Sequence, residues 1–226
     1  MKVAVVTPYY KENKKVLKRC IDSVAKQTYE DVIHVVVSDG YPQDWIHDHT
    51  LHHLCLPNVG NYGDTPRGIG AAYAAGVGAD AIVFLDADCW LPTDHIDRML
   101  DTLRYNPGVV TCPRNVWLDG KLAGPCLESN GIHFNDTNCY LISKAYFHVM
   151  SAWMFKNQKD SIVGDRVFWD AIKRSGANIL RCHSHVNYDS TLAFHYQMFG
   201  IDPPVNSRIL VNGEVWKWGD YVNRVN

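Results

Sequence analysis

The residues from Ala81 to Leu91 read AIVFLDADCWL, and the first five form a short apolar run with β-branched and aromatic side chains. Such a run is typical of a strand that is buried on both faces of a sheet. It leads into Asp86 and Asp88, two acids that are costly to bury unless something pairs with them. Because alternate residues of a strand point to the same face, both carboxylates can converge on one point. The stretch therefore predicts a sheet with a charged site at the end of one strand.

Ligands of open α/β sheets lie outside the carboxyl ends of the strands. Oxygen ligands suit Mg²⁺ or Mn²⁺, and magnesium typically shares its carboxylates with a substrate phosphate. We therefore predict a divalent-metal and phosphate site at Asp86 and Asp88. The alternative is that both acids serve only as turn or helix-capping residues.

The composition is that of one globular domain, with 226 residues of which 46% are hydrophobic and 20% charged. The formal net charge of −2 offers no broad basic surface, so we expect no nucleic acid partner. The seven cysteines are odd in number and form no CxxC pair. This pattern argues against a disulfide framework or a zinc site and favours a reducing, cytoplasmic location.

The opening segment MKVAVVTPYY is broken by Pro8 too early to be a signal peptide. No apolar run approaches the roughly 20 residues that are needed to span a bilayer. We therefore expect no transmembrane segment, and any membrane contact would be peripheral.

The first 90 residues alternate between apolar runs and helical patterns. Strands are predicted at residues 2–7, 32–37, 52–56 and 81–85. Asn13 can cap a helix that runs to about residue 26, and the polar stretch 44–53 is a short helix or a loop. A glycine-rich loop over 57–70 leads into a helix at 71–76. Strand, helix and strand in succession form right-handed units with parallel strands, so this order predicts a doubly wound half domain.

The second half has a less regular pattern. A helix is predicted over 93–105 with Thr93 as its N-cap, followed by a strand at 109–112. From about residue 114 the sequence is polar, glycine-rich and aromatic. Beyond it we expect a strand at 138–143, a helix at 144–154, a polar loop at 157–164, a helix at 165–175 and a strand at 178–182.

With these elements placed, the sequence resembles the family 2 glycosyltransferases, which have the GT-A fold. Four features in order support the resemblance: VAVVTPYY at the first strand, SVAKQTYED at the end of the first helix, VVVSDG at the second strand, and FLDADC after PRGIGAAYAAG. The second half resembles the family more loosely, through NCYLISKAYF and GDRVFWDAIKRSG.

The resemblance implies an α/β fold of the GT-A type, which is a Rossmann-like, mostly parallel sheet flanked by helices in a single domain. It implies that residues 1–110 bind the nucleotide sugar and that residues 111–226 bind the acceptor and supply the catalytic base. The implied reaction is an inverting transfer from a nucleotide sugar, often a UDP-sugar, with Mn²⁺ or Mg²⁺ as cofactor. The resemblance does not identify the transferred sugar or the acceptor, which could be a glycan, a lipid-linked molecule or a small molecule.

The resemblance also assigns donor-binding roles. Thr7, Pro8 and Tyr9 match the family's nucleotide-contacting loop. Asp39 matches the acid that holds the uracil ring, and Arg67 matches an arginine that contacts the base or the diphosphate.

Further matches concern the metal and the reaction. Asp86 and Asp88 match the DxD motif, with Asp86 also facing the donor and Asp88 as the direct metal ligand. Asp165 matches the catalytic base at the start of a helix. Many proteins of this fold complete the metal shell with a histidine near the C-terminus, and the candidates here are His183, His185 and His195.

The chain also departs from the family pattern. Ser38 stands where the second strand usually has Asp, Gly68 follows Arg67 where Asn is common, and Gly164 precedes Asp165 where Glu is usual. The QxxRW signature of processive members is absent, so we expect a non-processive enzyme.

Two other functions stay open. Because Gly164 stands where Glu is usual, one alternative is a catalytically silent domain that only binds a nucleotide sugar. A sugar-phosphate nucleotidylyltransferase has a related fold, but it calls for a basic glycine-rich loop after the first strand, and TPYYKEN does not supply one. The same segment argues against NAD, whose fingerprint G-x-G-x-x-G directly follows the first strand.

Overall fold

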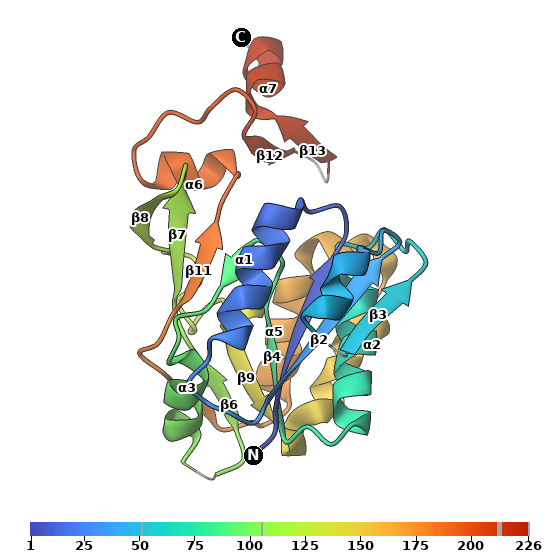
Figure 1. Cartoon of the computed structure of the whole chain (residues 1–226). Coiled ribbons are helices and arrows are strands. Elements are labelled where there is room, and N and C mark those ends of the chain that lie inside the picture. The colour runs from blue at the N-terminus through green and yellow to red at the C-terminus, as the bar shows by residue number, and fades with distance from the viewer. Residues whose placement is uncertain (51, 105, 212–213, 226) are drawn as a thin grey trace.

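The computed structural model of the chain describes residues 1–50, 52–104, 106–211 and 214–225. Its centre is a seven-stranded sheet in the order β10-β6-β9-β4-β1-β2-β3 (Figure 1). The strands are β1 (Val3–Tyr9), β2 (Val32–Asp39), β3 (His52–Leu56), β4 (Ala81–Phe84), β6 (Val109–Thr111), β9 (Tyr140–Ser143) and β10 (Ile179–Arg181). Strand β9 runs antiparallel to both of its neighbours, and every other pairing is parallel. The mostly parallel, Rossmann-like sheet that we predicted is confirmed.

Helices cover the sheet on both faces. On one face, alternate residues such as Val3 and Val5 of β1 pack in a cluster with α1 (Lys14–Ala25) and α3 (His95–Leu103). On the other face, Ala4 and Val6 pack in a cluster with α2 (Asp64–Gly76), α4 (Ser151–Met154) and α5 (Gly164–Arg174). Since β4 and the first four residues of β1, Val3 to Val6, are fully buried, they read as unbroken apolar runs in the sequence.

The first helix begins where the sequence predicts it. The side chain of Asn13 accepts a hydrogen bond from the backbone N–H of Val16 at 3.0 Å, and α1 starts at the next residue, Lys14. This contact satisfies one of the donors that a helix start leaves free.

The prediction of a loop over 57–70 is wrong in its second part, because α2 already begins at Asp64. Pro66 lies in the first turn, where its missing N–H costs no helical hydrogen bond. Gly70 faces the sheet, and a Cβ there would lie 2.5 Å from Cγ1 of Val6 and 2.9 Å from Cγ2 of Val37. One of the glycines that suggested a loop, Gly70, therefore lets the helix approach the sheet closely.

The predicted helix over 144–154 is mainly the 3₁₀ segment η3 (Lys144–Met150), followed by α4. Further 3₁₀ segments are η1 (Asp44–Asp48), η2 (Thr137–Cys139) and η4 (Gln158–Val163), of which the last lies in the stretch that we expected to be a loop. Thr93 does not cap α3, whose N-cap is Asp94 without a side-chain hydrogen bond. The backbone carbonyl of Thr93 instead accepts from the N–H of Thr28 at 2.8 Å. The last residue of that predicted helix, Tyr105, lies outside the described residues.

A second sheet covers one end of the first and was not predicted. Its strand order is β5-β11-β7-β8, with bounds Cys89–Trp90, Val186–Asp189, Arg114–Leu118 and Lys121–Pro125 respectively. The backbone N–H of Asp189 donates to the carbonyl of Asp88 at 3.2 Å, so β11 ends beside the acidic pair. Helix α6 (Ala193–Met198) follows β11 in the chain.

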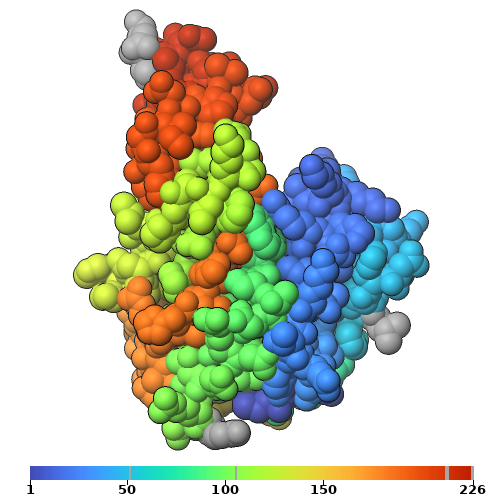
Figure 2. All heavy atoms as spheres, turned by 60° about the vertical axis from the view of Figure 1, so that its left-hand side comes forward, coloured from blue at the N-terminus to red at the C-terminus, as the bar shows by residue number. Residues whose placement is uncertain are grey.

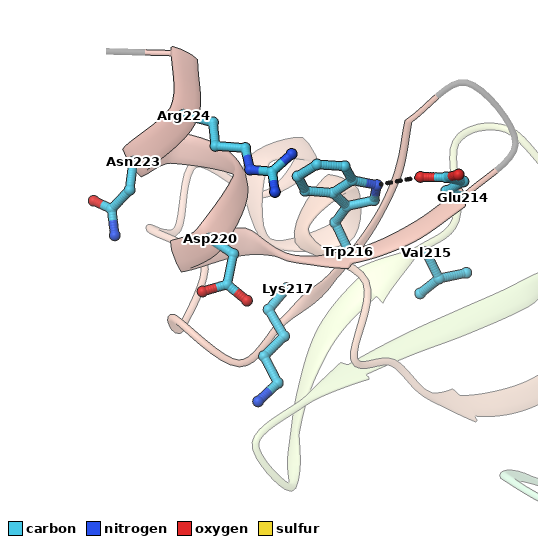
Figure 3. A pocket seen from close by; sticks show the side chains of 7 residues that line it. All are labelled: Glu214, Val215, Trp216, Lys217, Asp220, Asn223 and Arg224. Atoms are coloured by element: carbon cyan, nitrogen blue, oxygen red, sulfur yellow. Dashed lines mark hydrogen bonds between the residues drawn. The ribbon is translucent and has the colours of Figure 1, made fainter.

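The last segment consists of the antiparallel pair β12 (Arg208–Val211) and β13 (Glu214–Lys217) with helix α7 (Trp218–Val225). It stands out from the rest of the molecule in the space-filling view (Figure 2). An open pocket of about 610 Å³ lies on it (Figure 3), where the guanidinium carbon of Arg224 is 4.2 Å from the ring centre of Trp216. None of the residues lining this pocket belongs to the predicted site.

Among the described residues, no helix is long and apolar enough to cross a membrane.

Candidate active site

The predicted donor-binding residues lie at the carboxyl ends of neighbouring parallel strands. Tyr9 ends β1, Asp39 ends β2, and Asp86 lies two residues beyond the end of β4. Helix α2 begins near the same edge, because Arg67 from its first turns reaches Asp86. This is the edge at which open α/β sheets bind ligands.

Asp86 is held from two sides. Its Oδ1 forms an ion pair with Nη2 of Arg67, whose side chain is 10% exposed. Its Oδ2 accepts a hydrogen bond from Nδ2 of Asn138 at 3.0 Å, and its backbone N–H donates to Oδ1 of the same asparagine. These contacts fix the orientation of the Asp86 carboxylate before any ligand binds.

Arg67 is itself positioned by the structure around it. Its Nη1 donates to the backbone carbonyl of Tyr62 at 2.9 Å, and its guanidinium carbon lies 5.2 Å from the ring centre of Trp153. A planar guanidinium held in this way presents its donors in a fixed direction, as bidentate recognition of a phosphate requires.

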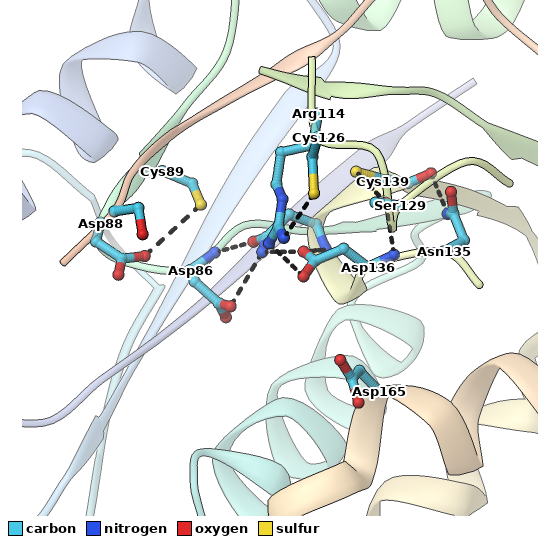
Figure 4. Close-up of polar contacts among 12 residues, drawn as sticks. Asp86, Asp88, Cys89, Arg114, Cys126, Ser129, Asn135, Asp136, Cys139 and Asp165 are labelled. Atoms are coloured by element: carbon cyan, nitrogen blue, oxygen red, sulfur yellow. Dashed lines mark hydrogen bonds and ion pairs between the residues drawn. The ribbon is translucent and has the colours of Figure 1, made fainter. Parts of the chain in front are cut away.

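A second ion pair adjoins the first and was missed from the sequence. Nη1 of Arg114 pairs with Oδ2 of Asp136 (Figure 4). Oδ1 of Asp136 accepts a hydrogen bond from Nδ2 of Asn138 at 2.7 Å. Asn138 thus bridges Asp86 and Asp136. The only hint in the sequence is the polar run FNDTN, which leads into the strand predicted at 138–143, since polar residues that are buried must find partners.

Asp88 has little support within the protein. Its Oδ1 receives a weak hydrogen bond from Sγ of Cys89 at 3.6 Å, and no ion pair reaches it from the described part of the chain. Burial, with the negative charges of Asp86 and Glu12 nearby, raises the pKa of Asp88 to about 7 although the charge of Arg208 opposes this shift. A bound cation would favour the ionised form of the Asp88 carboxylate. The oxygens of Asp86 and Asp88 therefore fit a hard divalent metal.

No three histidine, cysteine, aspartate or glutamate side chains of the described residues are grouped so that they could hold a metal ion by themselves. A metal at Asp88 would therefore need further oxygen ligands from water and from a substrate. Magnesium and manganese accept such a mixed shell.

Asp165 lies in the first turn of α5, and its Oδ1 accepts from the backbone N–H of Arg166 at 2.7 Å. Burial raises the pKa of Asp165 to about 6, helped by the negative charge of Asp136. Figure 4 shows Asp165 projecting from its helix toward the side on which Asp136 and Asp86 lie. The structure thus brings the predicted base, from the second half of the chain, toward the acidic pair from the first half.

The predicted nucleotide loop presents little side-chain surface. The hydroxyl of Thr7 is buried and lies 2.8 Å from Nε2 of His34, and Pro8 is buried too. The hydroxyl of Tyr9 lies 2.8 Å from Nε2 of His53. Oδ1 of Asp39 accepts from the backbone N–H of Val59 at 2.7 Å.

The structure does not bring His185 or His195 to Asp88, and the third candidate, His183, is exposed between β10 and β11. His185 precedes β11, and the charges that act on it come from Arg98 and Asp94, at the end of the strand remote from Asp88. His195 is buried in α6, where its Nδ1 lies 2.7 Å from Oγ of Ser190 and its Nε2 faces Sγ of Cys126 at 4.0 Å. Burial lowers the pKa of His195 to about 4, so the ring is neutral but already engaged.

Comparisons with known proteins agree with this geometry. The sequence model described as Glycosyl transferase family 2 matches residues 4–157. The solved structure of S. aureus TarS superposes with a TM-score of 0.68 at 14% identity, covering 87% of this chain and 38% of that one. TarS 1–349 in complex with UDP gives 0.67 at 16% identity, with 87% and 63% covered, so this chain spans less than two thirds of either.

GalNAc-T7 with UDP, GalNAc and Mn²⁺ gives a TM-score of 0.61 at 13% identity, covering 83% of this chain and 44% of that one. At these identities the likeness shows the fold. No match was found among curated protein sequences.

Proposed function

The chain belongs to glycosyl transferase family 2, and on that premise we propose that it transfers a sugar from a UDP-sugar to an acceptor hydroxyl. The proposal rests on one observation. Two carboxylates with raised pKa values, Asp88 at about 7 and Asp165 at about 6, come from different halves of the chain and adjoin one network around Asp86. Titratable groups that lie at one site and whose pKa values differ from the ordinary values are typical of an active site.

The donor would lie along the carboxyl edge of β1, β2 and β4. Asp39 at the end of β2 is our candidate for the uracil contact, next to the segment Thr7, Pro8 and Tyr9 at the end of the neighbouring strand β1. Arg67 would contact the diphosphate while it stays paired with Asp86. Two solved structures of one protein with this fold support this choice of donor, since TarS has been crystallised with UDP and with UDP-GlcNAc.

The leaving group of such a donor is a nucleoside diphosphate, on which negative charge develops as the glycosidic bond breaks. A divalent cation, Mn²⁺ or Mg²⁺, would be held by Asp88 with Asp86 and would supply Lewis-acid stabilisation of that charge. Arg67 adds a fixed positive charge on the same side. Asn138 keeps the Asp86 carboxylate turned toward the site through the hydrogen bond of 3.0 Å.

Asp165 is our candidate for the catalytic base. With a pKa of about 6 it is ionised at neutral pH, yet it is more basic than an ordinary aspartate. It would take the proton of the acceptor hydroxyl as that oxygen attacks the anomeric carbon. Attack from the side opposite to the leaving diphosphate inverts the configuration, as with the base of inverting glycosidases.

The remaining expectations follow from this assignment. We propose that residues 1–110 bind the donor and that residues 111–226 shape the acceptor site and supply the base. The seven free cysteines, of which Cys55 is exposed, favour a reducing compartment such as the cytoplasm. A single, non-processive transfer agrees with the absence of the QxxRW signature.

The decisive experiment is a calorimetric titration of the protein with UDP and with GDP, in the presence and absence of Mn²⁺, beside an Asp88→Ala variant. We expect UDP to bind in a metal-dependent way and the variant to lose that dependence. Binding of UDP without any release of UDP from UDP-sugars would favour a silent domain. Failure to bind either nucleotide would overturn the proposed function.

A further inference from the structure

A buried ion pair joins the start of α2 to the segment that precedes the proposed base. Nζ of Lys156 lies 2.6 Å from Oδ2 of Asp64, and the two side chains are 6% and 2% exposed. Asp64 is the first residue of α2, and Lys156 lies between α4 and η4. The pair therefore connects the donor-binding half of the chain to the half that carries Asp165.

The pair also contacts the residue next to the base. A Cβ on Gly164 would lie 2.7 Å from Oδ1 of Asp64 and 3.4 Å from Nζ of Lys156. Gly164 is the first residue of α5, and Asp165 follows it directly. The backbone at the start of α5 thus rests against the carboxylate of Asp64, and only glycine leaves room for that contact.

The same pair shares an aromatic neighbour with the donor side of the site. Nζ of Lys156 lies 5.0 Å from the ring centre of Trp153 and 3.4 Å from its backbone carbonyl. The guanidinium carbon of Arg67 lies 5.2 Å from the same ring. Trp153 is buried, so the cations of Lys156 and Arg67 are held at one rigid surface.

A buried ion pair is not by itself a source of stability, because desolvation of both charges can exceed their attraction. The depth of Asp64 and Lys156 also keeps them from touching a substrate. We propose that Asp64 and Lys156 are positioning residues, which fix the first turn of α5 and thereby the place of the Asp165 carboxylate relative to Arg67 and Asp86. This inference rests on the proposed function.

The test compares three proteins. Removal of one partner leaves a buried lone charge and endangers folding, so the variant is the double change Asp64→Leu with Lys156→Met, which removes both charges and keeps apolar bulk. The control is Lys173→Met, which removes the exposed ion pair between Lys173 and Asp170 on the same helix. The probe is whichever of UDP-glucose, UDP-galactose, UDP-GlcNAc and UDP-GalNAc releases UDP fastest with the unaltered protein.

Two readouts are taken on each protein. In the double variant we expect faster backbone hydrogen exchange at residues 157–168 and a kcat for UDP release that falls by tens to about 10²-fold, because a displacement near 1 Å can cost that much. The KM for the UDP-sugar should stay within about twofold, since Arg67 and Asp86 are unchanged. The control should match the unaltered protein in all of these.

The outcomes separate the two proposals. A double variant that exchanges and turns over like the unaltered protein would overturn the positioning role, and so would faster exchange with an unchanged kcat. A fall in donor affinity equal to the fall in kcat/KM would also overturn it, because the pair would then serve donor binding. Absence of UDP release from the unaltered protein would instead overturn the proposed function and this assignment with it.

A second variant tests the contact at the helix start independently. Gly164→Ala should reduce kcat in the same way, because the added Cβ collides with Oδ1 of Asp64. Gly76→Ala is the matched control, since a Cβ there meets nothing within 4 Å. An unchanged kcat in Gly164→Ala would contradict the proposed rigidity of this turn.

Discussion

Asn138 contacts Asp86 twice, through Nδ2 at 3.0 Å from Oδ2 of the carboxylate and through Oδ1, which accepts the backbone N–H of the same aspartate. The two residues lie opposite each other on antiparallel segments, because Asp86 follows β4, Asn138 precedes β9, and these two strands pair. The asparagine therefore sets both the backbone and the side chain at the first acid of the DxD motif.

Asn138→Ala should lower the kcat/KM for the UDP-sugar by about 10- to 100-fold, the range found when a residue that orients a metal ligand is lost. It should also cost about 1–3 kcal/mol of unfolding free energy, since buried polar groups of Asp86 and Asp136 lose their partner. Initial rates and urea titrations check both effects. Asn223→Ala, on an exposed side chain of α7, should change neither.

The pH dependence of kcat/KM at saturating Mn²⁺ should reveal Asp165. A base acts only when ionised, and the pKa of Asp165 in the free protein is raised to about 6, so kcat/KM should fall as pH is lowered through about 6 and approach a tenfold loss per pH unit below it. Asp165→Asn should cost about 10²–10⁴-fold at neutral pH. Asp170→Asn, an exposed position on the same helix, is the control, and a profile that is flat between pH 5 and 7 would contradict the assignment of the base.

Binding of Mn²⁺ together with UDP should weaken as the pH falls below about 7. Protons compete with the metal for the Asp88 carboxylate, whose pKa is raised to about 7, so the apparent affinity should drop by up to tenfold for each pH unit below that value. Calorimetry at pH 6, 7 and 8 measures this trend. Asp88→Asn should abolish the metal dependence at every pH, and a pH-independent affinity in the unaltered protein would argue that the metal lies elsewhere.

Acid should destabilise the fold through His34. Burial lowers the pKa of His34 to about 3, while in the unfolded chain it returns to about 6.5, so unfolding takes up a proton between these values. The free energy of unfolding is therefore unaffected by His34 above pH 6.5, and below that pH it falls by about 1.4 kcal/mol per pH unit. Urea titrations at pH 7 and 5 of the unaltered protein and His34→Gln measure the difference. His183→Gln, on the exposed surface, should keep the slope of the unaltered protein.

Much of the fold could be predicted from the sequence because it depends on local periodicity. The runs at β1, β2 and β4 are buried on both faces, and the Asn13 cap, the Asp-Ala-Asp step and the start of α5 are each defined by a few neighbouring residues. The loop predicted over 57–70 failed for a tertiary reason. Glycine disfavours an isolated helix, but here the close approach of Gly70 to Val6 and Val37 compensates.

The sequence by itself thus determined the order along the chain of the seven strands of the central sheet, and it placed Asp86 and Asp88 at a strand end and Asp165 at a helix start. The tertiary structure decided which of the other polar residues join them. Strand β9 lies antiparallel between β4 and β6, and this brings Asn138 and Asp136 to Asp86, whereas His185 and His195 are directed to other partners. The physical reason is that partners far apart in the chain share no local period, so only the packing of the two sheets and the helices specifies their contact.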